Sequence, residues 1–113
     1  MSRAKKKFRK DVEKLVLDRD GHKCRVCGRK PKLSTDERLD VHHIWPRNKM
    51  PYQGYVTENL ISLCTDCHYK AEMYLQGRSS TADCNWAFLY SLIGSSFEEA
   101  WMACKKCEAN TTE

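Results

Sequence analysis

The sequence of 113 residues lacks any apolar run near the roughly 18 residues that a membrane-spanning helix needs. Its first ten residues, MSRAKKKFRK, lack the apolar centre of a signal peptide. It also lacks internal repeats and low-complexity segments, and it is too short for a second catalytic domain. We therefore expect one soluble, cytoplasmic domain over residues 1–113, with no membrane partner.

Apolar residues are also in modest supply, at 41% against the usual share of about 45 to 50%. The core is therefore expected to be small and to benefit from a structural staple. Seven cysteines could supply it. Their odd number, two pairs at Cys-x2-Cys spacing and an expected reducing compartment favour a metal over disulfides.

The charges are distributed unevenly along the chain. Residues 1–50 carry 16 Lys and Arg against 7 Asp and Glu, whereas residues 51–113 carry 4 against 8. A basic half suits a polyanion, because neutralising phosphates releases counterions, although a charge run alone is more often a solvated surface. The candidate DNA phosphate contacts are Lys5, Lys6, Lys7, Arg9, Lys10, Arg29, Lys30, Arg47 and Lys49.

Hydrophobic periodicity predicts an α+β chain. A basic amphipathic helix is expected over residues 4–20, with Gly21 just beyond its end. A strand over residues 39–44 is ended by Pro46, and a long connection over 46–58 leads to a return strand over 60–63. Helices follow over residues 65–76 and, in two pieces, over 82–109, where Ser96 and Glu99 form a capping box.

Four cysteines have the spacing of a structural zinc site: Cys24, Cys27, Cys64 and Cys67, with 36 residues between the two pairs. Gly28 lets the backbone turn beneath the first pair, and the second pair opens a helix whose N-terminus favours an anionic sulfur. Buried free cysteines are the alternative. A second zinc site is disfavoured because only three cysteines remain, so we expect buried or partly exposed thiols at Cys84, Cys104 and Cys107.

A second group of residues argues for chemistry. His42, His43, Asn59 and His68 fall within 27 residues, on a predicted hairpin and its following helix. A lone histidine is usually structural or, as expected for His22, on the surface, and a lone asparagine is usually a turn residue. Four such residues together are harder to explain by packing.

Two acidic residues lie near this group. Glu72 is four residues after His68 and therefore on the same helix face, where it is either a further metal ligand or a solvated glutamate. Asp40 shares a strand face with His42 and could orient its imidazole, as metal-bound histidines often require. An ordinary aspartate at a loop edge is the alternative.

At these residues the chain resembles the HNH endonuclease family, in particular members with a built-in zinc ribbon. The resemblance is carried by DVHHI with a proline two residues on, by TENLISLC and by CTDCH, and it spans about half of the chain, up to Gly77. It implies a ββα-metal core, a β-hairpin plus a helix, that hydrolyses phosphodiester bonds with one divalent cation, Mg²⁺ or Mn²⁺. It also implies 5′-phosphate and 3′-hydroxyl products and suggests a bacterial or phage origin.

The resemblance implies a role for each matched residue. His42 falls at the first metal-ligand position, which many members fill with Asp, His43 at the general base, Asn59 at the motif asparagine and His68 at the last metal ligand. All four are expected to face the phosphate. Independently, an imidazole with a pKa near 6.5 can deprotonate a water molecule at neutral pH.

Strand and helix geometry adds two expectations. Successive strand residues point to opposite faces, so His42 should face the helix and its metal while His43 addresses the attacking water. Cys67 and His68 diverge by about 100° on their helix and can therefore serve two different ions.

The function expected is a metal-dependent DNA endonuclease that nicks or cuts both strands. No base-reading motif is found, so low sequence specificity is expected. The competing class is a non-enzymatic zinc-ribbon module that binds nucleic acid, and the basic half permits an RNA-directed nuclease equally.

Overall fold

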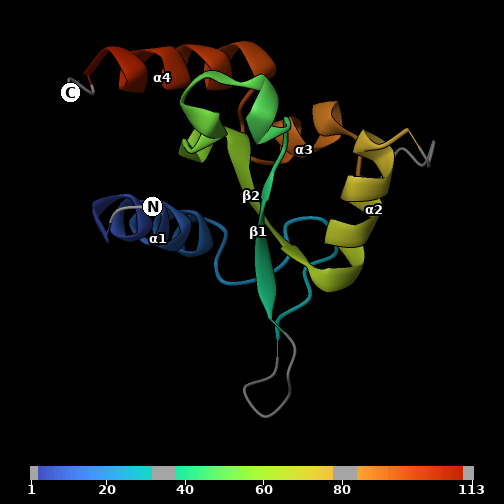
Figure 1. The fold of residues 1–113 in the computed structure, drawn as a ribbon. Coiled ribbons are helices and arrows are strands. Elements are labelled where there is room, and N and C mark those ends of the chain that lie inside the picture. Colours follow the sequence, from blue (N-terminus) through green and yellow to red (C-terminus); the bar gives the residue numbers. More distant parts are fainter. Residues whose placement is uncertain (1–2, 32–37, 78–83, 111–113) are drawn as a thin grey trace.

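A computed structural model of the chain describes residues 3–31, 38–77 and 84–110. Two antiparallel strands, β1 (Leu39–His43) and β2 (Leu60–Cys64), form its sheet. Helix α1 (Arg3–Arg19) lies on one side of this hairpin and α2 (Thr65–Leu75) on the other (Figure 1). The chain ends with α3 (Trp86–Leu92) and α4 (Phe97–Asn110). The α+β class and the ββα core are thus confirmed, with the hairpin one residue shorter on its first strand than expected.

The connection between the strands is not a plain loop. It consists of three short 3₁₀ turns, η1 (Arg47–Lys49), η2 (Pro51–Gly54) and η3 (Thr57–Asn59). Tyr52 and Gln53 have φ of 57° and 53°, and Gly54 follows with φ of 67°. Two non-glycine residues in a row in the left-handed region are costly, so surrounding contacts must hold this turn.

Strand register fixes which side chains face which helix. His42 pairs with Ile61 and His43 with Leu60. Leu60 joins a cluster with Val12 and Val16 of α1, whereas Ile61 joins the main core on the side of α2. The two histidines therefore point to opposite faces of the sheet, as the alternation predicts.

The end of α1 is shaped by Gly21, whose φ is 71°. The N–H of Gly21 donates to the carbonyl of Asp18 at 3.2 Å, and the N–H of His22 donates to that of Leu17 at 2.9 Å. This pair of bonds is the Schellman pattern, and it turns the chain out of the helix directly before the first cysteine pair. His22 is exposed and contacts Asp18 at 2.7 Å, which confirms its expected surface position.

Asp20 ties this corner to the sheet. Its carboxylate is 1% exposed, accepts two bonds from Arg19 at 2.8 and 3.0 Å, and accepts the N–H of Ser62 at 2.8 Å. Arg25 lies 3.6 Å from the same carboxylate and donates to the carbonyl of Leu92. The buried charge is thus compensated, and α1, β2 and the turn between Cys24 and Cys27 are held in one arrangement.

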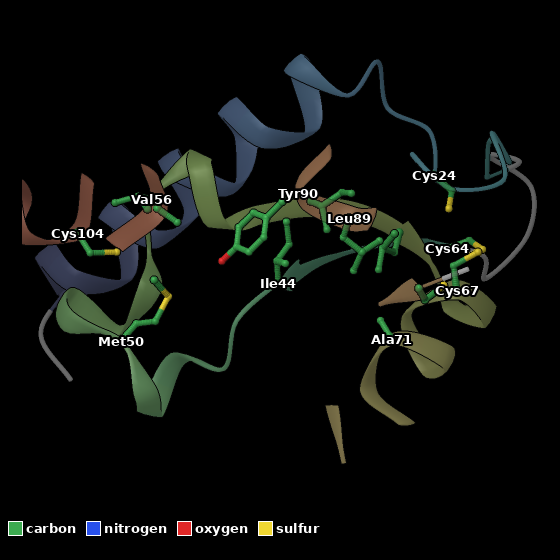
Figure 2. Close-up of a cluster of buried hydrophobic side chains, with 14 residues drawn as sticks. Cys24, Ile44, Met50, Val56, Cys64, Cys67, Ala71, Leu89, Tyr90 and Cys104 are labelled. Carbon is green, nitrogen blue, oxygen red and sulfur yellow. The ribbon is translucent and has the colours of Figure 1, made fainter. Parts of the chain in front are cut away.

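The main core includes Ile61 and Leu63 of β2 and therefore lies on their face of the sheet. Figure 2 shows Ile44, Leu89 and Tyr90 in its middle, with cysteine side chains gathered at one end and Met50 and Cys104 at the other. Helix α3 begins after Asn85, whose side chain accepts the N–H of Phe88 at 2.8 Å, and α4 begins after Ser96, which accepts the N–H of Glu99 at 3.1 Å. The predicted C-terminal segment is therefore two helices, with residues 82–83 outside the described part.

None of the helices in the described ranges combines the length and the apolar character that crossing a membrane would require.

Candidate functional site

The four cysteines of the two pairs converge. The sulfurs of Cys24, Cys27, Cys64 and Cys67 all lie within 4.8 Å of one another, and those of Cys27 and Cys64 are 3.7 Å apart. Zn–S bonds of about 2.3 Å in a tetrahedron require sulfur separations of about 3.8 Å. The cluster therefore fits a structural zinc ion.

The ionisation of these thiols also fits a cation. Burial opposes ionisation of Cys24, but hydrogen bonds from the backbone at Cys27, Cys64 and Val26 outweigh it and lower the pKa of Cys24 to about 7. Burial raises the pKa of Cys67, and that of Cys27 is raised as well. Cys27 and Cys67 thus favour the neutral thiol beside the readily ionised sulfur of Cys24, and a bound Zn²⁺ would supply the positive charge that favours thiolates.

A second cluster lies on the α2 side of the hairpin and joins His42, His68 and Glu72. Glu72 Oε1 is 3.2 Å from His42 Nδ1 and 3.4 Å from His68 Nε2, and the two imidazole rings are 5.1 Å apart. Glu72, which the sequence left as either a ligand or a solvated group, thus stands beside both histidines. Contact with His42 holds the pKa of Glu72 below its usual value.

His42 gives the strongest indication that this cluster can bind a metal. Its side chain is 1% exposed, and neither ring nitrogen has a well-aligned hydrogen bond to any described residue. Glu72 is close to Nδ1 but not aligned with it as an acceptor. Burial lowers the pKa of His42, so the ring is neutral and both nitrogens are costly to leave unpaired. The neutral imidazole is the form in which histidine binds metals.

Asp40 does not orient His42, and that expectation is wrong. Its Oδ2 instead accepts from Nδ1 of His68 at 3.0 Å. His42 is buried, whereas the partly exposed His68 of α2 reaches the Asp40 carboxylate of β1. Because Nδ1 of His68 is bonded to Asp40, its Nε2 is the nitrogen that lies beside Glu72. A carboxylate bonded to one nitrogen of a histidine whose other nitrogen can bind a metal is common in metal sites.

His43 lies on the opposite face, against α1. Its ring meets the ring of Tyr55 edge-on at 4.6 Å, and its Nε2 is buried without a hydrogen-bond partner in the described residues. Burial lowers the pKa of His43 to about 4, with His42, Arg47 and Arg9 acting in the same direction. The value is below the 6.5 expected from the free side chain, so the imidazole is neutral at pH 7 and is a weaker base than a free histidine.

Asn59 does not face the phosphate, contrary to expectation, because its side chain is 0% exposed. Its Oδ1 accepts from the N–H of Trp45 at 3.1 Å and from the hydroxyl of Tyr90 at 2.6 Å. Its Nδ2 donates to the carbonyls of Trp45 at 3.2 Å and Gly54 at 3.3 Å. Asn59 therefore bridges the two ends of the connection that follows His43.

Sequence reasoning missed the partners of Asn59. A Cβ atom at Gly54 would lie 2.7 Å from Asn59 Nδ2 and 3.4 Å from Cδ2 of His43, so only glycine fits there. Tyr90 is on α3, far along the chain, and nothing in its local sequence marks it as more than a core aromatic. The glycine at position 54, within a long connection, is the signal in the sequence that could have indicated this close packing.

The predicted phosphate contacts are distributed over the surface. Arg9 is partly buried, and Arg29 is exposed but 3.4 Å from the carboxylate of Asp66. The side chains of Lys5 and Lys6 lie outside the described part of the structure. The remaining predicted contacts are exposed: Lys7, Lys10, Lys30, Arg47 and Lys49. Their contact with DNA stays a prediction.

The last three cysteines form no metal cluster among the described residues, where only the two groups above qualify. Cys84 and Cys104 are buried and Cys107 is partly buried, as expected for thiols. Burial raises the pKa of Cys104 to about 11.

A hairpin and a helix that join a four-cysteine cluster to a histidine–carboxylate cluster define a ββα-metal domain with a zinc ribbon. Comparison with family models agrees, since residues 24–72 match the family described as HNH endonuclease. The matched segment begins at the first zinc-site cysteine and ends at Glu72, so it contains both clusters. Residues 24–72 thus resemble an HNH endonuclease domain, a kind of domain that generally acts on nucleic acids. No curated protein and no solved structure matches the chain significantly.

Proposed function

We propose that the protein is a metal-dependent DNA endonuclease with low sequence specificity. The observation that carries this proposal is the buried imidazole of His42, whose ring nitrogens make no aligned hydrogen bond and which lies beside His68 and Glu72. A module that only bound nucleic acid would have no use for two imidazoles and a carboxylate held together at this cost.

The donor set informs the choice of cation. His42, His68 and Glu72 would hold the ion, with Asp40 fixing His68. Two imidazoles and one carboxylate suit Mn²⁺ or a later transition metal better than Mg²⁺, which prefers oxygen ligands. When bound, the cation supplies charge stabilisation to the phosphate and to the leaving oxygen.

His43 is the proposed general base. Its ring is neutral at pH 7, and it lies on the strand next to His42 but on the opposite face, so it approaches the phosphate from the other side. There it takes a proton from the attacking water. Gly54 and Asn59 position this ring through the connection, which packs closely against it.

The substrate is proposed to be DNA bound through its phosphates. The predicted contacts come from α1, from the turn after Cys27 and from η1, and none of these elements has the form of a base-reading module. The domain extent over residues 1–113 and the cytoplasmic location stay predictions.

The test is cleavage of a supercoiled plasmid by the purified, zinc-loaded protein with Mg²⁺, Mn²⁺, Ni²⁺ or Zn²⁺ added in turn. Substitution of His43→Ala should abolish cleavage while Mn²⁺ binding, followed by calorimetry, is kept. His68→Ala should weaken Mn²⁺ binding as well as cleavage.

The matched control is His22→Ala, which removes an exposed histidine that belongs to neither cluster and should cleave at the wild-type rate. If wild type leaves plasmid, duplex and single-stranded DNA intact with every cation while still binding them, the binding-module alternative is correct. Cleavage of a structured RNA in preference to all DNA forms would instead identify an RNA-directed nuclease.

A further inference from the structure

Arg9 of α1 is brought to the face of the sheet that carries His43. Its Nη2 donates to Oε1 of Gln53 at 2.6 Å, and its guanidinium carbon lies 4.8 Å from the centre of the Tyr55 ring. The Tyr55 ring in turn meets the His43 ring edge-on at 4.6 Å. Arg9, Tyr55 and His43 thus form one continuous layer, although Arg9 lies outside the segment that matches the HNH family.

The side chain is held by several contacts at once. Gln53 belongs to the turn in which Tyr52 and Gln53 both have positive φ, and Phe8 meets Tyr52 edge-on at 5.6 Å beside it. A costly backbone conformation that presents Gln53 to Arg9 is of the kind that clusters at functional sites. The guanidinium is therefore fixed in advance, which distinguishes it from the exposed Lys7 and Lys10 on the same helix.

The chemistry of the Arg9 side chain also suits a phosphate. A guanidinium offers a planar set of N–H donors that matches two phosphate oxygens, which an ammonium group does not. Fixed donors aimed at oxygens that gain charge during a reaction stabilise its transition state.

We propose that Arg9 is a further catalytic residue, whose guanidinium binds the non-bridging oxygens of the scissile phosphate beside His43. This role rests on the proposed function. The water oxygen attacks phosphorus, the bond from phosphorus to the 3′ oxygen breaks, the water proton passes to His43, and the released 3′ oxygen takes a proton from solvent. Arg9 stabilises the negative charge that grows on the non-bridging oxygens, and α1 is accordingly part of the active site.

The experiment measures single-turnover cleavage of a labelled duplex with Mn²⁺ at saturating protein, together with the dissociation constant for the same duplex with Ca²⁺. Arg9→Ala should lower the saturated rate by about 100-fold, the usual loss for one such donor, while the dissociation constant rises only a few-fold. Arg9→Lys keeps the charge but loses the fork, so its rate should fall by about tenfold. Added guanidinium ion at a non-denaturing concentration should partly restore Arg9→Ala and leave His43→Ala inactive.

Lys14→Ala is the matched control, because it removes an exposed cation from the same helix and should leave the saturated rate within about twofold of wild type. Unfolding midpoints and zinc content are measured for each variant. Saturated rates of both Arg9 variants equal to wild type, or reduced only in proportion to the unfolded fraction, would overturn the role of Arg9 while the nuclease function stands. An inactive wild type would overturn both.

Discussion

Asn59 and Tyr90 offer a quantitative test of how the connection after His43 is held. Tyr90→Phe removes one hydroxyl, and with it a 2.6 Å hydrogen bond to an oxygen that keeps its second donor, the N–H of Trp45. A bond of this kind contributes about 1 kcal/mol net to the free energy of unfolding. Asn59→Ala removes four bonds in a place with 0% exposure, so about 4 kcal/mol is expected.

The two changes should not be additive. In the Asn59→Ala background the Tyr90 hydroxyl is a buried donor without its partner, so replacing it by phenylalanine should be neutral or stabilising. The loss of stability caused by Tyr90→Phe should therefore vanish or reverse in the Asn59→Ala background. A domain of this size unfolds with about 5 to 15 kcal/mol in total, so the single Asn59 variant stays measurable.

The assay is urea unfolding followed by tryptophan fluorescence, with zinc at a fixed excess for all four proteins. At a slope of about 2 kcal/mol per molar urea, Tyr90→Phe should lower the midpoint by about 0.5 M in the wild-type background. The same loss of stability in both backgrounds would show that the two side chains do not interact, and the reasoning on Asn59 would be refuted.

Three further outcomes are expected. Removal of zinc by a chelator, or Cys24→Ser, should unfold most of the protein, and metal analysis should give one zinc per folded chain; folded protein free of zinc would contradict the cluster's role. Asp40→Asn should weaken Mn²⁺ binding by about 10- to 100-fold in calorimetry through its contact with His68, with little loss of stability. Burial raises the pKa of Cys104 to about 11, so its thiolate is scarce below that pH. Iodoacetamide should therefore label Cys104 only as the pH approaches 11. Labelling at pH 8, detected by mass spectrometry, would contradict its burial.

Short-range sequence patterns predicted most of the elements. The two Cys-x2-Cys pairs, the alternation at His42 and His43 and the glycine after α1 all depend on geometry within a few residues, and each has the arrangement expected. The position of Cys67 beside His68 at the start of α2 follows from the same local geometry.

Contacts between distant segments could not be predicted in this way. Asp40 shares a strand face with His42, yet it bonds to His68, because the choice depends on where α2 crosses the sheet. Asn59 is a turn residue by local rules and a buried bridge in the structure, because Tyr90 arrives from α3. The pKa of His43 differs from the free value mainly because of burial, with His42, Arg47 and Arg9 acting in the same direction, and the burial is not visible in the residues next to it.

Cys67 and His68 are consecutive residues, so the two clusters share the first turn of α2. The helix that carries His68 and Glu72 is anchored at its start by sulfur. Oxidation of the four cysteines would free the start of α2 from the zinc site. His68 and Glu72, which lie on this helix, could then move away from His42 together. On the proposed function, an oxidant would therefore inactivate the nuclease without modifying any group that contacts the phosphate.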